Sequence, residues 1–185
     1  MERTIKKLTT KEAIAEIEKN NRDFNMILLH KGFMTKDDFP FNMSQIINGV
    51  TIWPPVDIHP SAKIGKGSII GRYTNIFGDI SIGKNTRIQG FCYIPDCVEI
   101  GECVFIGPGV VFANVKRPKV RNNMMKQRDG KIIIHDDVSI GAGVIIGPGV
   151  EIASGVTIGM GAVITKSITK KNSVFIGIPA KEFIK

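Results

Sequence analysis

The sequence contains very few leucines. Only three occur among the 185 residues, all within the first thirty positions, and from residue 46 onward the apolar residues are almost all isoleucine and valine. Leucine suits helices, whereas β-branched side chains suit strands. We therefore expect a chain that is helical only near its start and β thereafter.

Cysteines and long hydrophobic runs are also scarce. Cys92, Cys97 and Cys103 form no CxxC pair, which excludes a disulfide framework and a paired-thiol zinc site and fits a reducing compartment. The longest purely apolar run near the N-terminus, from Met26 to Leu29, has four residues. This is too short for a signal-peptide core or a transmembrane helix, so we expect a cytoplasmic protein with no membrane partner.

Acidic residues are nearly absent from one stretch. Residues 113–131 contain seven basic side chains and one acidic side chain, and the whole chain has a net charge of +8. A nucleic-acid surface would spread its basic groups over a face and interleave them with aromatic residues, which this stretch lacks. The stretch therefore favours an anionic ligand bound at one place, and a solvated loop is the alternative.

Isoleucine recurs at every sixth position from Ile46 to Ile106, Phe112 takes the next position, and the period resumes in a new phase from Ile134 to Ile164. Neither a helix nor a simple strand gives a period of six. The repeat predicts a triangular solenoid in which each hexapeptide is a short strand and a turn. The isoleucine and the residue four later point inward, three hexapeptides close a coil of about eighteen residues, and roughly five or six coils stack on one another.

Two segments lie outside this repeat. In residues 1–45, Thr9 and Glu12 form a capping-box pattern followed by apolar residues at helical spacing, which predicts a short helical segment covering the end of the solenoid. A role in substrate binding is the alternative for that segment. The solenoid itself spans 46–182 and is interrupted by an excursion loop at 113–133, and long polar loops in compact domains are usually functional or disordered.

The hexapeptides IGKGSI, IGECVF, IGPGVV, IGAGVI and IGMGAV resemble the repeats of the left-handed β-helix acyltransferase superfamily. The resemblance implies an all-β fold, a left-handed parallel β-helix. It also implies a homotrimer with active sites between adjacent prisms, and a loop that leaves one corner and leans over the neighbouring subunit's cleft.

Within this superfamily the chain looks closer to the N-acetyltransferases of amino-sugar nucleotides. The segment from Arg87-Ile88-Gln89 to Pro108, then Asn114 with Pro118 four residues later, matches their pattern without gaps. The resemblance implies acetylation of the amine of a nucleotide-linked sugar, with Asn114 orienting the amine and Gln89 near the sugar. Lys116 and Arg117 would then clamp the phosphates of this small-molecule acceptor. Val115 departs from the pattern, because the family usually has Asp there.

The C-terminal coils resemble those that bind coenzyme A, so acetyl-CoA is the expected acyl donor. Glycine and alanine let the pantetheine arm approach the backbone, and two lysines can face the phosphates. The candidate cofactor-binding residues are Gly141, Ala142, Gly159, Thr165, Lys166, Pro179 and Lys181.

Two alternatives stay open. One is a sugar or small-molecule O-acetyltransferase, in which a hydroxyl needs a positioned base. Galactoside and maltose acetyltransferases have a histidine before the loop proline, whereas Arg117 precedes Pro118 here, so His135 at the loop's exit is the remaining candidate base. The other is a non-catalytic trimeric scaffold. No metal site is expected, because a zinc site between subunits needs three imidazoles and only one of the three histidines is near the loop.

Overall fold

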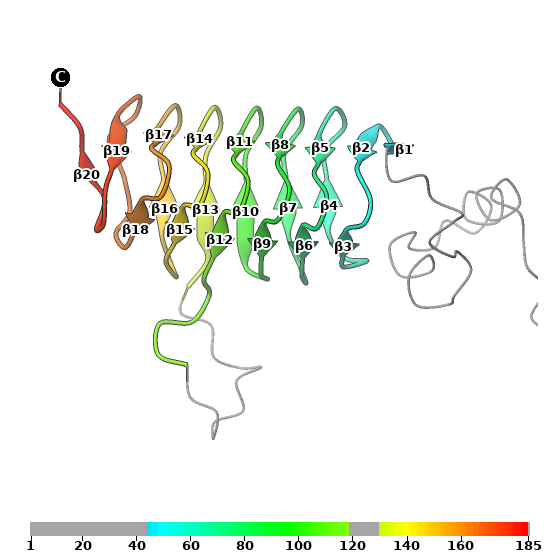
Figure 1. Ribbon diagram of the computed structural model, residues 1–185, viewed down its shortest axis with the longest axis horizontal. Coiled ribbons are helices and arrows are strands. Elements are labelled where there is room, and N and C mark those ends of the chain that lie inside the picture. Colours follow the sequence, from blue (N-terminus) through cyan, green and yellow to red (C-terminus); the bar gives the residue numbers. More distant parts are fainter. Residues whose placement is uncertain (1–43, 119–129, 185) are drawn as a thin grey trace, which may run out of the picture. The chain divides into compact units, whose positions relative to one another are not determined.

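The computed structural model describes residues 44–118 and 130–184, and these ranges contain no helix. They form a parallel β-solenoid, whose coils follow one another along a single axis (Figure 1). The all-β prediction is confirmed for this part of the chain. The expected helical segment within 1–45 lies outside the described residues. In the described ranges no helix is present that could cross a membrane.

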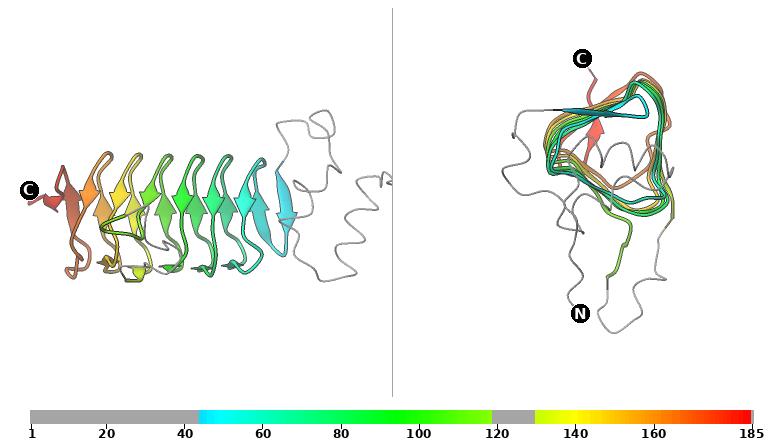
Figure 2. Two further views of the ribbon diagram at one scale, coloured as in Figure 1. Left: turned by 90° about the horizontal axis from the view of Figure 1, so that it is seen from below. Right: turned by 90° about the vertical axis from the view of Figure 1, so that its right-hand side faces the viewer.

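Each coil contributes one strand to each of three sheets, which we call faces A, B and C. Seen end-on, successive coils superimpose around a common interior (Figure 2). Face A contains β1 (Gln45–Ile47), β2 (Val50–Ile52), β5 (Ile69–Ile70), β8 (Arg87–Ile88), β11 (Phe105–Ile106), β14 (Ser139–Ile140), β17 (Thr157–Ile158), β19 (Val174–Ile176) and β20 (Lys181–Glu182). Face B contains β3 (Asp57–Ile58), β6 (Asn75–Ile76), β9 (Tyr93–Ile94), β12 (Val111–Phe112), β15 (Ile145–Ile146) and β18 (Val163–Ile164). Face C contains β4 (Lys63–Ile64), β7 (Ser81–Ile82), β10 (Val98–Ile100), β13 (Ile132–Ile134) and β16 (Glu151–Ile152).

The register confirms the coil length. Ile52 pairs with Ile70, Ile70 with Ile88, and Ile88 with Ile106, so neighbouring strands of a face are eighteen residues apart. The isoleucines that end the strands and the residues four positions later fill the interior. This interior is the core, and its largest fully buried side chains are Phe112, Ile58, Ile70, Ile76, Ile88, Ile94, Ile106, Ile132, Ile134, Ile140, Ile146 and Ile152.

Both ends of the solenoid depart from the parallel pattern. β1 runs antiparallel to β2, and Ile46, the first isoleucine of the period, is 77% exposed instead of inward. At the other end β20 runs antiparallel to β19. An uncovered parallel edge would leave a row of unpaired backbone groups, and a hairpin strand satisfies part of that row.

The chain turns at three corners, which we name by the faces they join: A–B, B–C and C–A. The excursion loop leaves at a B–C corner after β12 and rejoins at β13, where Val98 pairs with Ile132 and Ile100 with Ile134. The coil register is therefore kept across the loop. Only the ends of the loop, residues 113–118 and 130–133, are among the described residues.

Candidate functional site

One column of side chains follows the B–C corner. The Ala113 N–H donates to the Ile146 carbonyl, and the Gly147 N–H donates to the Ile164 carbonyl, both at 2.8 Å. The next residue in each of these coils is therefore stacked as well, which places Asn114, Pro148 and Lys166 along one edge. At a strand spacing of ~4.8 Å, Asn114 and Lys166 are about 10 Å apart along the axis.

Asn114 lies at the root of the excursion loop and is half-buried. Its Nδ2 donates a hydrogen bond of 2.7 Å to Oδ1 of Asp96, which occupies the same corner one coil earlier. Lys116 and Arg117 follow and are exposed. Asp96 was not among the sequence-predicted residues, although it stands eighteen residues before Asn114, which is one coil length.

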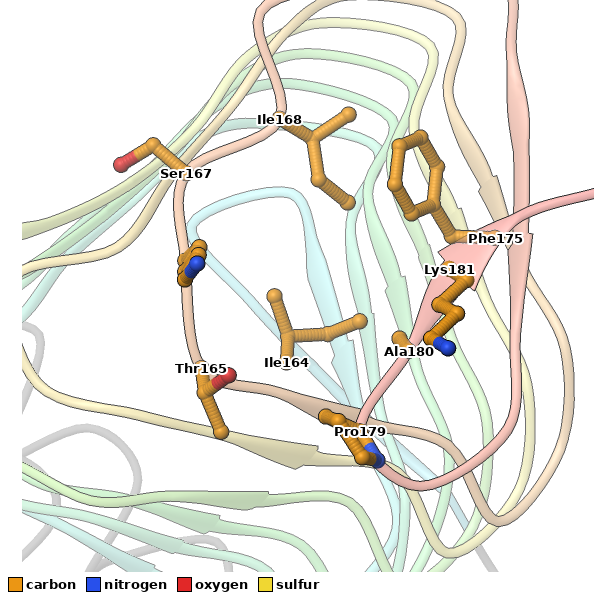
Figure 3. Close-up of a pocket in the computed structure, with 9 residues that line it drawn as sticks. Ile164, Thr165, Ser167, Ile168, Phe175, Pro179, Ala180 and Lys181 are labelled. Carbon is orange, nitrogen blue, oxygen red and sulfur yellow. The ribbon is translucent and has the colours of Figure 1, made fainter.

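The C-terminal end of the prism holds a pocket of about 300 Å³. Ile164 and Ile168 point into the space enclosed by the last coil from one side, and Phe175, Lys181 and Pro179 lie on the other side (Figure 3). Four of the seven predicted cofactor residues line this pocket, namely Thr165, Lys166, Pro179 and Lys181. Lys170 is paired with Glu182, whereas no ion pair within the described ranges involves Lys166 or Lys181.

The other predicted cofactor residues lie at the A–B corner. Gly141 and Gly159 are stacked there, since the Gly141 N–H donates to the Ile158 carbonyl at 2.8 Å. A Cβ on Gly141 would come within 2.5 Å of the Met160 backbone nitrogen, so close packing of the coils requires glycine at this position. Ala142 follows and is exposed, and Gln89 occupies the same column as Gly141 two coils earlier and is half-buried. These residues thus lie at the opposite edge of face B from Asn114.

An apolar stripe runs over face B and the two corners that flank it. The rings of Tyr73 and Phe91 stack with their centroids 4.9 Å apart, and those of Phe77 and Tyr93 are 5.6 Å apart. The stripe continues on face B, where β12 and β15 are paired. Its members, all more than a third exposed, are Tyr73, Phe77, Phe91, Tyr93, Val111 and Ile145.

His135 follows β13 on face C, near the C–A corner. Its Nε2 is 2.7 Å from Oε1 of Glu151 on the neighbouring strand, and both side chains are about half exposed. Because an ionised carboxylate only accepts hydrogen bonds, Nε2 carries the hydrogen, and in the neutral imidazole Nδ1 is left as the acceptor. Asn114 and His135 thus stand at opposite ends of face C and have different partners.

The three cysteines do not form a reactive group. Cys92 points into the solenoid, and its Sγ lies 3.3 Å from the Gly107 carbonyl oxygen, so burial raises the pKa of its thiol. Cys97 and Cys103 occupy corner turns with φ angles of 63° and 56°. Among the described residues no group of three or more His, Cys, Asp or Glu side chains is placed to hold a metal ion.

The chain matches the family described as bacterial transferase hexapeptide (six repeats), over residues 79–114 and 131–166. It is 31% identical over 141 residues to the bifunctional protein GlmU of Thermodesulfovibrio yellowstonii, which covers 76% of this chain and 29% of GlmU. The chain thus spans less than a third of the length of the curated GlmU relatives that it matches.

Two solved structures are also similar. A maltose O-acetyltransferase from Clostridium difficile is 30% identical, with a TM-score of 0.58, over 66% of this chain and 68% of that one. Perosamine N-acetyltransferase from Caulobacter crescentus, solved as a mutant with CoA and GDP-perosamine, is 21% identical, with a TM-score of 0.61, over 74% of this chain and 57% of that one. The second likeness shows the fold alone.

Proposed function

Because the chain belongs to the bacterial hexapeptide-repeat transferases, we propose that it is a CoA-dependent acyltransferase that acetylates the amine of a nucleotide-linked amino sugar. The observation that carries the proposal is the B–C column. It places Asn114, a side chain able to orient an acceptor, about 10 Å along the same edge from Lys166 and the C-terminal pocket.

The pocket is the proposed site for part of the donor, acetyl-CoA. Its floor is apolar and its rim carries the exposed Lys166 and Lys181, a combination that suits a ligand with both an apolar part and phosphates. A relative of the same fold was solved with CoA. The glycines of the A–B corner would contact the pantetheine arm, because their lack of side chains leaves the backbone accessible.

The reaction is direct transfer. The acceptor amine attacks the thioester carbonyl, the new C–N bond forms as the C–S bond breaks, and the proton leaves the nitrogen for the departing thiolate or water. The Oδ1 atom of Asn114 accepts a hydrogen bond from the amine and orients it for attack. Lys116 and Arg117, two and three residues after Asn114 at the root of the loop, would bind the diphosphate of the acceptor.

We further propose that the active unit is a homotrimer. Candidate residues occupy two edges of one prism, Asn114 at the B–C corner and Gln89 with the glycines at the A–B corner, and the exposed apolar stripe lies between them. Packing prisms against one another would cover this stripe and bring the B–C edge of one subunit toward the A–B edge of the next.

A second candidate function is O-acetylation. The hydrogen bond between His135 and Glu151 favours it, because a carboxylate that fixes the imidazole tautomer leaves Nδ1 free to act as a general base. The likeness to a maltose O-acetyltransferase supports the same candidate. The first proposal is preferred since His135 lies at the far end of face C from the loop root.

Binding of acetyl-CoA tests the donor assignment. At about 100 times the Kd, a ligand that binds only the folded chain should raise the Tm by about 5–10 °C. Lys166→Ala and Lys181→Ala should each weaken acetyl-CoA binding by about tenfold. Lys171→Ala is the matched control, because it removes an exposed lysine from the same end of the solenoid without touching the pocket.

A transferase must also release CoA thiol when an amino-sugar nucleotide is added. If acetyl-CoA leaves the Tm unchanged and no thiol is released with any acceptor, the chain is a non-catalytic scaffold and the proposal is wrong.

A further inference from the structure

The Asn114 side chain is hydrogen-bonded to a carboxylate of the preceding coil. Its Nδ2 donates to Oδ1 of Asp96 at 2.7 Å, and both side chains are half-buried. Asp96 sits directly against the preceding coil, because a Cβ on Gly78 would come within 2.7 Å of the Asp96 Cβ. The two side chains therefore meet at a packed corner and not at a loop tip.

This contact fixes which way the Asn114 amide faces. A carboxylate cannot donate a hydrogen bond when ionised, so the amide must present its NH₂ group to Asp96. The amide oxygen consequently points away from Asp96 and remains an acceptor. Val115, the residue after Asn114, has no polar side-chain atom. The carboxylate that contacts Asn114 is instead that of Asp96, in the preceding coil.

We propose that Asp96 is a positioning residue for acyl transfer, which acts through Asn114 by fixing the direction and raising the basicity of the amide oxygen that receives the acceptor amine. This inference rests on the proposed function. It adds Asp96 to the acceptor side of the site, with a specific geometry for the Asn114 amide.

The negative charge of Asp96 also favours the transition state of acyl transfer. As an amine attacks a thioester, its nitrogen gains positive charge before it loses a proton. A carboxylate hydrogen-bonded to the far side of the Asn114 amide increases the negative charge on Oδ1, and hydrogen-bonded chains strengthen one another in this manner. The pair therefore stabilises the transition state more than the bound, neutral amine, and an effect of this kind appears in kcat.

Substitutions of Asp96 in the full-length protein test the proposal. Asp96→Ala should lower kcat for thiol release with an amino-sugar nucleotide by about 10- to 100-fold, while the KM for acetyl-CoA stays within about twofold. Asp96→Asn keeps an acceptor oxygen for the Asn114 amide but removes the charge, so its kcat should fall less than that of Asp96→Ala. Asp79→Ala is the matched control, an exposed carboxylate at the same corner one coil earlier, and should leave kcat unchanged.

A double-mutant cycle tests whether Asp96 acts on catalysis by positioning Asn114 or only stabilises the corner of the solenoid. If Asp96 acts through Asn114, adding Asp96→Ala to Asn114→Ala should lower kcat less than about twofold further. The side-chain amide resonances of Asn114 in ¹⁵N-labelled protein should also shift in Asp96→Ala and not in Asp79→Ala. Unchanged resonances, an unchanged kcat in Asp96→Ala, or equal losses with and without Asn114 would overturn the inference and leave the proposed function standing. Absence of thiol release already in the wild-type protein would overturn the proposed function, and the inference with it.

Discussion

At the scale of single residues, Asn114 and His135 each have one carboxylate partner, but the two pairings prepare different chemistry. Asp96 turns the Asn114 amide so that its oxygen is presented outward, which suits an acceptor that carries its own N–H hydrogens. Glu151 turns the His135 imidazole so that Nδ1 is presented, which suits a hydroxyl that must lose its proton during attack. The nucleophile therefore decides which of the two residues is needed.

Asn114→Ala and His135→Ala report which nucleophile the enzyme uses. For an amine acceptor, we expect Asn114→Ala to lower kcat by about 10- to 100-fold and His135→Ala to lower it by less than about threefold. Thiol release should be measured for both variants with amino-sugar and hydroxyl acceptors. For a hydroxyl acceptor, loss of the base would cost a factor of ~10² to 10⁴. A nearly inactive His135→Ala beside a nearly normal Asn114→Ala would contradict N-acetylation and support O-acetylation.

The sequence could have predicted the contact between Asp96 and Asn114, but not the stacking of Asn114 with Lys166. Once the coil length of eighteen is known, Asp96 falls directly below Asn114, so that contact follows from arithmetic on the repeat. The stacking of Asn114 with Lys166 could not be found in this way, because the excursion loop lies between their coils and its length shifts the period. Only the pairing of β12 with β15 shows which residues meet across the loop.

At the scale of elements, the coils differ in what fills their inward positions. The isoleucine period predicts the three faces and the inward isoleucines, and these are confirmed. In the first coils, however, the residue four after the isoleucine is often polar, as in Ser68, Thr74 and Thr86, and each of these buried hydroxyls donates to a carbonyl of the next coil. In later coils valine takes the same place. The ends were not predicted, because the hairpins β1–β2 and β19–β20 pair antiparallel and leave the period.

The hydroxyl of Thr86 should contribute measurably to stability. Its Oγ1 donates to the Gly101 carbonyl at 2.9 Å and accepts the Val104 N–H at 3.2 Å. Thr86→Val keeps the volume but leaves both groups without this partner, so we expect the free energy of unfolding in urea to fall by about 1–3 kcal/mol. Thr157→Val is the control on the exposed side of face A and should change it by less than about 0.5 kcal/mol. Equal free energies of unfolding for Thr86→Val and Thr157→Val would mean that the buried hydroxyl of Thr86 contributes nothing to stability.

At the scale of the whole molecule, face B separates two sets of candidate residues that cannot meet within one prism. Asn114 and the loop root lie at its B–C edge, and Gln89, Gly141 and Gly159 lie at its A–B edge. A site that uses both edges therefore requires two subunits, whereas a site limited to the B–C column and the C-terminal pocket requires only one. The two arrangements make different predictions for mixed assemblies.

Mixed trimers distinguish a shared site from a single-chain site. One parent carries Asn114→Ala, which disables the B–C edge. The other carries Gly143→Tyr, which fills the A–B edge. A side chain at Gly143 strains the backbone, because its φ is 66°, but Tyr73 and Phe91 in the same column already adopt similar positive φ angles. A Cβ on Gly143 meets nothing within 4 Å, so the fold should tolerate the substitution. Each parent alone should be nearly inactive.

Random mixing in equal amounts makes about three quarters of the trimers mixed, and in a cyclic trimer each mixed assembly contains one site with neither defect. Activity should therefore return to about a quarter of the wild-type value, measured as thiol release per subunit after unfolding and refolding the two parents together. Parents refolded separately and then combined provide the control. If verified mixed trimers stay as inactive as the parents, the two edges do not form one site across a subunit interface. If Gly143→Tyr alone keeps its activity, acyl transfer uses only the B–C column and the C-terminal pocket of a single chain.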